Sequence, residues 1–189
     1  ARKQFEDGNF AEAYQGLRSL LLQEKDDPEL PTDLNQAVQS LQRLGRVDEF
    51  DEFIEATVAA HPNDWRLLVS AARHYQTIEK YGQKVAGKFY RGGRNGGGEW
   101  ASAVDRDRVR SLQLFEAARK LVVDEQSSDN LGSFYSTFAG AIQNVEPFRL
   151  QALTDLSVLP DYSDQTPWGF RGGSQPQGAP VDAEGNPVY

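Results

Sequence analysis

Residues 31–64 carry two stripes of apolar residues at helical spacing, and this pattern constrains the fold more than any other feature of the chain. Gly45 separates the stripes, as expected of a residue that ends a helix in the left-handed conformation, and Pro62 closes the segment. The spacing of three and four residues predicts two helices joined by a short turn, a hairpin of 34 residues. The stripes are Leu34, Ala37, Val38, Leu41 and Leu44, followed by Val47, Phe50, Ile54 and Val58.

The segments on either side keep the same register. Residues 8–21 predict the second helix of an earlier unit, with the turn glycine Gly8 in front of it. A third unit begins after Pro62, but some two dozen extra residues separate its two helices. A looser fourth unit follows. The helices expected outside the central hairpin are 8–21, 65–81, 105–121, 131–142 and 147–159.

A helix–turn–helix unit of 34 residues, with a glycine at the turn and a terminal proline, resembles the tetratricopeptide repeat. The resemblance implies an all-α fold of about three to four tetratricopeptide-like hairpins. We expect a helical repeat domain over residues 1–159, with a Gly-rich insertion at about 82–105. An irregular, Pro/Gly-rich tail or linker toward a following domain is expected over 160–189. Strand is expected only as short pieces in the insertion or the tail, and an irregular helical bundle is the alternative fold.

The insertion contains the stretch KFYRGGRNGGGEW, residues 88–100. A phosphate-binding P-loop is excluded, because no Gly-Lys-Ser or Gly-Lys-Thr opens a helix after a strand there. Arg-Gly-Gly occurs at 91–93 and again at 171–173, which would suit a nucleic-acid-binding arm. The copies are far apart, however, and the chain has a net charge of −8. We expect the glycines to let an inserted loop turn sharply.

Charge is distributed unevenly along the chain. Residues 1–64 have a net charge of −8, residues 65–123 of +7 and residues 124–189 of −7. The basic middle predicts a local positive surface facing an acidic partner. Arg106 and Arg110 share a helix face because they are four residues apart. The candidate partner-binding residues are Arg91, Arg94, Arg106 and Arg110.

The acidic partner of these arginines has two possible sources. It is either another protein or domain, or the acidic ends of this chain, namely Asp161 and Asp164 or the carboxylates of residues 48–55. The alternative is a set of scattered, solvated arginines in exposed ion pairs, which contribute little. In the tail, Trp168 and Phe170 are the expected anchors, because large aromatic side chains in a Gly/Pro segment need burial to become ordered.

No catalytic, cofactor-binding or metal-ligating residues are expected. The chain has no cysteine, and its two histidines belong to no zinc-binding motif. No nucleophile-elbow sequence and no calcium-binding loop occurs. No run of apolar residues is long enough for a transmembrane helix. We therefore expect a protein that is not an enzyme.

Three phrases together resemble the helical-repeat region of large bacterial alpha-2-macroglobulin-like proteins. They are HPNDWRLL at 61–68, AVDRDRVRSLQLF at 103–115 and GAPVDAEGNPVY at 178–189. The resemblance implies a place within a larger, exported bacterial polypeptide, in the periplasm or at the cell surface. It supplies no catalytic residues, because the thioester of that family needs a cysteine that this chain lacks.

Two functions are therefore expected to compete. The first is a non-catalytic protein–protein interaction or scaffold module that binds a protein, a peptide or neighbouring domains. The second is nucleic-acid or phosphate binding through the basic insertion, or an unrecognised enzyme domain. The position of the arginines discriminates them: a concave pocket shared with a carboxylate or histidine favours the second, and a convex or solvated loop favours the first.

Overall fold

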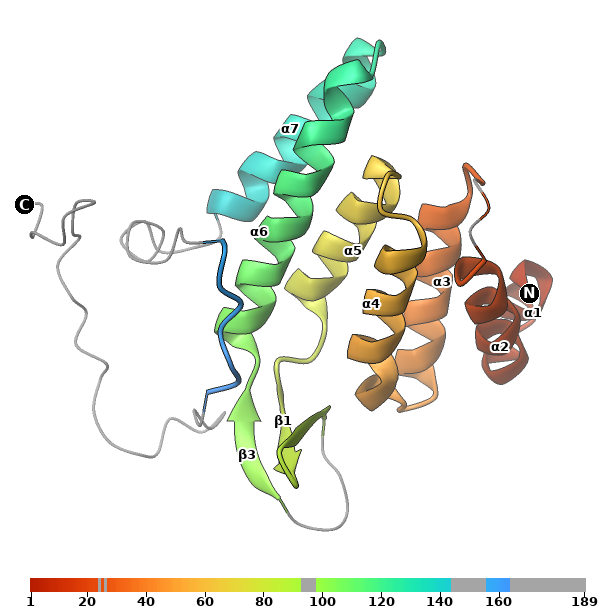
Figure 1. The fold of residues 1–189 in the computed structure, drawn as a ribbon. Coiled ribbons are helices and arrows are strands. Elements are labelled where there is room, and N and C mark those ends of the chain that lie inside the picture. The colour runs from red at the N-terminus through yellow and green to blue at the C-terminus, as the bar shows by residue number, and fades with distance from the viewer. Residues whose placement is uncertain (24, 26, 93–97, 144–155, 164–189) are drawn as a thin grey trace, which may run out of the picture.

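The computed structural model describes residues 1–23, 25, 27–92, 98–143 and 156–163, and these form a mostly helical molecule with one small sheet (Figure 1). None of the described helices is both long and apolar enough to cross a membrane. The α-helices are α1 Arg2–Glu6, α2 Phe10–Leu21, α3 Leu30–Arg43, α4 Phe50–Ala60, α5 Trp65–Thr77, α6 Val104–Leu121 and α7 Ser128–Gln143. Two 3-10 turns, η1 Val47–Glu49 and η2 Val122–Asp124, extend α4 and α6. The strands are β1 Tyr81–Val85, β2 Lys88–Arg91 and β3 Glu99–Ser102.

The central hairpin forms as its apolar stripes predict. Leu34, Ala37 and Leu41 of α3 and Phe50 and Ile54 of α4 are fully buried. Gly45 lies between the two helices with φ +67°, the left-handed conformation that a side chain disfavours. The second helix differs from the predicted one at its start. Its first residues form the 3-10 turn η1, and the α-helix begins at Phe50.

The helices stand side by side in a row that runs from α1 at one end to α7 at the other (Figure 1). Successive helices pack through one continuous hydrophobic core. Aromatic contacts attach the last helix to this row: Phe138 of α7 stacks on Phe115 of α6 with ring centroids 5.1 Å apart, and Phe134 of α7 meets Trp65 of α5 at 6.0 Å. The predicted helix 147–159 is not tested over 147–155, which lies outside the described residues, while 156–159 forms a turn.

The insertion between α5 and α6 folds as a three-stranded antiparallel sheet in the order β2-β1-β3. The all-α assignment is therefore wrong in this respect, although the strands of the described residues are short pieces of the insertion, as expected. β1 and β2 are joined by Ala86 and Gly87, which both have positive φ angles of 49° and 79°. Two residues in this conformation make the tight turn whose twist suits a β-hairpin.

A glycine on β1, Gly82, allows β2 to pack closely against β1. A side chain at Gly82 would place its Cβ 2.1 Å from the carbonyl oxygen of Tyr90 and 2.8 Å from the ring of Phe89. Gly82 is therefore required by the close approach of the neighbouring strand. The sheet has its own small apolar cluster of Phe89, Ala101 and Ala103, against which Tyr162 packs.

Residues 156–163, which we call the strap, run along α6 toward β3 (blue in Figure 1). The strap ends on the sheet, where Ser163 and Ser102 exchange backbone hydrogen bonds of 2.7 and 3.0 Å in an antiparallel bridge. Tyr162 stacks on Phe89 with ring centroids 4.1 Å apart. The expected tail anchors Trp168 and Phe170 lie outside the described residues.

Candidate binding site between α4 and α6

Arg91, at the end of β2, is the centre of a buried ionic cluster. Its side chain is 0 % exposed and bridges Asp51 of α4 and Asp107 of α6. The guanidinium donates to Asp51 over 2.6 and 3.0 Å and to Asp107 over 2.7 and 2.8 Å. The fifth N–H donates to the Glu79 carbonyl over 2.7 Å. Arg91 therefore fastens the sheet to both flanking helices with every donor satisfied.

Lys80 completes this cluster from the start of the insertion. Its ammonium group donates to Asp107 over 2.9 Å and to the carbonyl oxygen of Tyr75. Burial lowers the pKa of Lys80, and Asp107 only partly offsets it. Burial also raises the pKa of Asp51, although Arg91 opposes the shift. Burial alone would also lower the pKa of Arg91. The hydrogen bonds and charges of Asp107 and Asp51 outweigh burial and raise this pKa.

A second ion pair lies one turn further along α4 and α6. Arg110 donates to both oxygens of Glu55 over 2.7 and 2.6 Å, and the Tyr75 hydroxyl from α5 donates to the same carboxylate over 2.6 Å. Burial alone would raise the pKa of Glu55, but the hydrogen bonds from Arg110 and Tyr75 lower it below its usual range. Glu55 is therefore held as a carboxylate.

Arg106 differs from its neighbours because no ion pair within the described part of the chain links it to a carboxylate. Its guanidinium donates over 2.8 Å to the carbonyl oxygen of Pro160 in the strap. The same group lies over the Tyr162 ring, 4.9 Å from the centroid. Arg106 thus holds the strap against α6.

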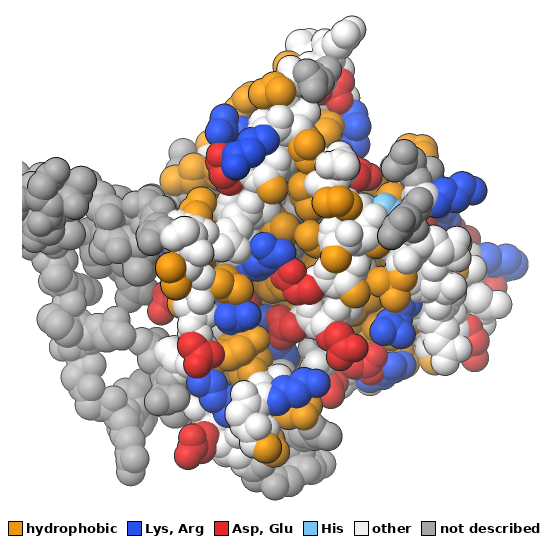
Figure 2. Space-filling view, viewed as in Figure 1, with side chains coloured by type: hydrophobic (Ala, Val, Ile, Leu, Met, Phe, Trp, Pro, Cys, Tyr) orange, Lys and Arg blue, Asp and Glu red, His pale blue; other side chains and the backbone are white. Residues whose placement is uncertain are grey.

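A pocket of about 240 Å³ lies where these groups meet. We call it the α4–α6 pocket. Figure 2 shows acidic and basic side chains gathered in the hollow between the two helices. Tyr75 of α5 borders it, and the strap contributes Leu159 and Tyr162. The lining residues are Asp51, Glu55, Tyr75, Arg106, Arg110, Leu159 and Tyr162.

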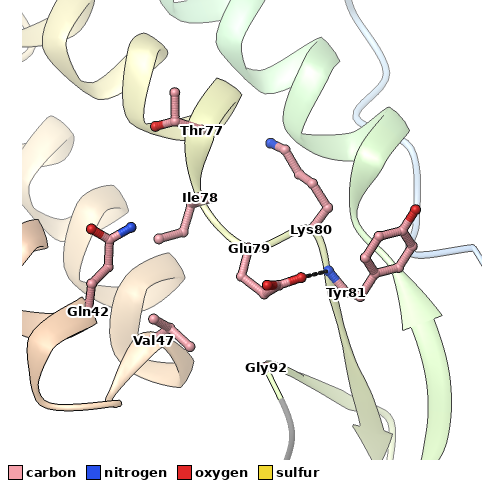
Figure 3. A pocket seen from close by; sticks show the side chains of 8 residues that line it. All are labelled: Gln42, Val47, Thr77, Ile78, Glu79, Lys80, Tyr81 and Gly92. Atoms are coloured by element: carbon pink, nitrogen blue, oxygen red, sulfur yellow. Dashed lines mark hydrogen bonds between the residues drawn. The ribbon is translucent and has the colours of Figure 1, made fainter. Parts of the chain in front are cut away.

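A second, more open pocket of about 530 Å³ lies on the other side of the insertion's base (Figure 3). Gln42, Val47 and Ile78 face into it from the ends of α3, η1 and α5. The Glu79 carboxylate on its rim accepts a hydrogen bond from the Tyr81 amide over 3.2 Å. Of the candidate arginines that the structure describes, none lines this pocket.

Three of the four candidate arginines, Arg91, Arg106 and Arg110, therefore come together, and Arg94 lies outside the described residues. Arg91 and Arg110 each meet a carboxylate of the segment 48–55, which belongs to one of the two sources considered from the sequence, and Arg91 also pairs with Asp107. Whether these arginines also bind another protein stays a prediction.

Sequence reasoning missed Asp107, Lys80 and Tyr162. Asp107 is not among the candidate residues, yet it is buried and pairs with Arg91 and Lys80. A signal was present, because Asp107 is in helical phase with Ser111, Leu114 and Ala118, all of which face the core. Tyr162 had no comparable signal, since its partner Phe89 is remote in sequence.

Among the described residues no group of three or more His, Asp or Glu side chains is arranged to hold a metal ion. Comparison of the chain with protein-family models, with curated proteins and with solved structures gives no match. The geometry of the α4–α6 pocket and of the helix row therefore provides the basis for a functional proposal.

Proposed function

We propose that this chain is a non-catalytic protein–protein interaction or scaffold module built from tetratricopeptide-like hairpins. One observation carries the proposal: the first five helices alternate between two layers. Helix α1 contacts α3 and α3 contacts α5 in one layer, while α2 contacts α4 in the other. Stacked hairpins in which each unit touches its neighbours present an extended binding surface, and that is how repeat proteins recognise partners.

The strap supports the scaffold role in particular. It is fixed to α6 through Arg106, to β1 through Lys84, which donates to the Tyr162 carbonyl over 2.9 Å, and to β3 through Ser163. The strap is therefore fixed to the body as far as Ser163. A fixed strap suits a spacer that orients a following domain, as in the exported, alpha-2-macroglobulin-like polypeptide that the sequence resembles.

The alternative functions gain less support from the site. Arg91 would be a main contact residue of a nucleic-acid-binding insertion. Its guanidinium is buried, and its N–H donors are bound to Asp51, Asp107 and a carbonyl group. The carboxylates Asp51 and Glu55 are each held by an arginine in a two-bond pair, which leaves them poorly placed for proton transfer.

Selection of random peptides displayed on phage against the immobilised chain tests the proposal. We expect enriched peptides of related sequence that bind in titration calorimetry and compete with one another for one surface. Single-stranded RNA, measured in parallel by fluorescence anisotropy, should not bind at physiological salt. Failure to enrich any peptide above a bare-surface control, or tight salt-dependent RNA binding, would contradict the interaction-module proposal.

A further inference from the structure

The small sheet at the end of α5 and α6 has two different faces (Figure 1). Its inner face packs on the body through Phe89, which stacks on Tyr162, and through Arg91, which pairs with carboxylates of α4 and α6. Successive residues of a strand point to opposite faces, and residues directly opposite on neighbouring strands share a face. Tyr90, which lies between Phe89 and Arg91, therefore belongs to the other face, which we call the outer face.

The outer face carries a row of three large side chains across the strands. Gln83 of β1 lies opposite Tyr90 of β2 on one side and opposite Trp100 of β3 on the other. Trp100 is 42 % exposed. The Oε1 atom of Gln83 is buried and has no hydrogen-bond partner among the described residues. By their register, the members of the outer face are Tyr81, Gln83, Val85, Lys88, Tyr90 and Trp100.

We propose that the outer face binds a segment of a partner protein that has two prolines three residues apart and adopts the polyproline II conformation. This inference rests on the proposed function and names the chemistry of the partner. Proline-rich segments dock on surfaces lined by aromatic side chains. Two strand spacings, about 10 Å, separate Tyr90 from Trp100. Three residues of polyproline II advance about 9 Å, so one proline ring can pack on each aromatic ring.

Gln83 lies between the two rings, where the backbone between the prolines crosses the sheet. A polyproline II segment makes no internal hydrogen bonds, so its N–H and C=O groups are open to a side chain. The side-chain amide of Gln83 offers both a donor and an acceptor. Rotation of this side chain toward the peptide gives its Oε1 atom the hydrogen bond that it lacks in the free chain.

The charge of the outer face indicates a further property of the segment. Lys88, which is exposed, is the charged residue that the strands place on this face, and its ammonium group lies 5.4 Å from the centroid of the Tyr90 ring. Glu99, the acidic residue of the three strands, lies on the inner face opposite Lys84. An acidic residue next to the proline that packs on Tyr90 therefore complements Lys88.

The sequence after the strap does not supply this segment. The prolines of residues 164–189 stand at positions 167, 176, 180 and 187, and no two of them are three residues apart. The spacing therefore favours a partner protein over the tail of this chain as the occupant of the outer face.

Nuclear magnetic resonance of the full chain, labelled with nitrogen-15, provides the test. The probe is the blocked peptide Ala-Pro-Ala-Ala-Pro-Glu-Ala. Saturable shifts are expected in the amides of Gln83, Tyr90 and Trp100 and in the Trp100 indole N–H. The peptide Ala-Pro-Ala-Ala-Ala-Pro-Glu-Ala, whose prolines are four residues apart, should bind more weakly by about tenfold, since only one proline then reaches an aromatic ring.

Substitutions on the sheet make separate demands on the affinity. Trp100→Ala should weaken binding by about tenfold or more, because a large aromatic anchor is lost. Lys88→Gln should weaken binding of the Glu peptide but not of the same peptide with Gln in place of Glu. Lys88 is exposed, so this variant remains informative if Trp100→Ala disturbs the sheet. The matched control is Tyr135→Ala, which removes a 48 % exposed aromatic side chain of α7 and should change nothing.

Several outcomes would overturn the inference. Absence of saturable shifts, equal affinity for the two proline spacings, or native affinity of the Trp100 variant would show that the aromatic row does not hold two prolines. Shifts at the outer face with cellohexaose or oligo-uridine, but not with the peptide, would assign the face to a sugar or a nucleic acid. If phage selection yields peptides without proline that bind away from the sheet, the proposed function survives while this inference fails.

Discussion

Arg91 is buried and paired with two carboxylates, Asp51 and Asp107. Removing one partner from a buried ion pair leaves the other charges uncompensated, which costs about 3–5 kcal/mol. We expect Arg91→Met to lower the free energy of unfolding by that amount, because Asp51 and Asp107 would lose their common partner. Urea denaturation followed by circular dichroism measures the loss.

The matched control for Arg91 is Arg119→Met. Arg119 also pairs with a carboxylate, Glu116, but at the surface of α6. Its replacement should leave the urea midpoint almost unchanged. Equal midpoints for the Arg91 variant and the native chain would mean that the buried cluster contributes no net stability.

His74 on α5 makes the stability depend on pH. Its Nε2 atom is buried with no hydrogen-bond partner, and burial, aided by the charge of Arg73, lowers the pKa from 6.5 to about 4. The unfolded chain therefore binds a proton between pH 6.5 and 4 that the folded chain does not, so stability falls as the pH decreases through this window. We expect His74→Gln to flatten that decline, measured as urea midpoints over a pH series. Parallel profiles for the two proteins would contradict the assignment.

The residues of the site were only half predictable from the sequence. Arg106 and Arg110 were expected on one helix face, and both line the pocket, because helical phase is a local property. The pairing of Arg91 with Asp51 and of Arg110 with Glu55 spans 40 and 55 residues, and no local pattern specifies which carboxylate meets which arginine.

Among the elements, the β1–β2 hairpin contains a residue in an unfavourable conformation. Ala86 has a φ of 49°, which costs an L-residue about 1–2 kcal/mol. We expect Ala86→Asn to stabilise the hairpin by about 1 kcal/mol, since Asn-Gly is the preferred pair for this turn. The thermal midpoint and amide exchange of β1 and β2 measure the gain. Gly87→Ala should act in the opposite direction, and a stabilising effect there would contradict the turn geometry.

The strap is the element held most clearly by one aromatic contact. Tyr162→Ala removes the ring that stacks on Phe89 and lies beneath Arg106, and we expect a loss of about 1–3 kcal/mol. Amide exchange at Ser102 and Ser163, which are paired across the bridge, should accelerate. Tyr162→Phe keeps the ring and should retain native protection. Equal exchange in the alanine variant would show that the strap is held by its backbone contacts alone.

The same two elements show where prediction from the sequence stops. The apolar stripes gave the right type for every described helix from α2 to α7, because each stripe lies within a single helix. The hairpin lacked the Asn-Gly or Asp-Gly signal that would have revealed it, since Ala86 occupies that position. Short strands were expected in the insertion, but their register and their pairing with the strap were not foreseen.

At the scale of the whole molecule, the alternation of acidic and basic segments along the chain becomes an internal pairing. The basic insertion and α6 meet the acidic α4 on one side and Asp161 of the strap on the other. The charge segregation thus orients segments that are distant in sequence. Arg106 makes no ion pair with a carboxylate among the described residues, and it lines the α4–α6 pocket.

The Arg91 cluster also bears on how the molecule unfolds. In a stack of hairpins each unit touches only its neighbours, so such arrays tend to melt in stages from their ends. Arg91 instead binds α4 of one hairpin and α6 of the next through a single guanidinium, so the two cannot separate without exposing three charges at once. We therefore expect the part of the chain from α4 to α6 to unfold as one cooperative unit.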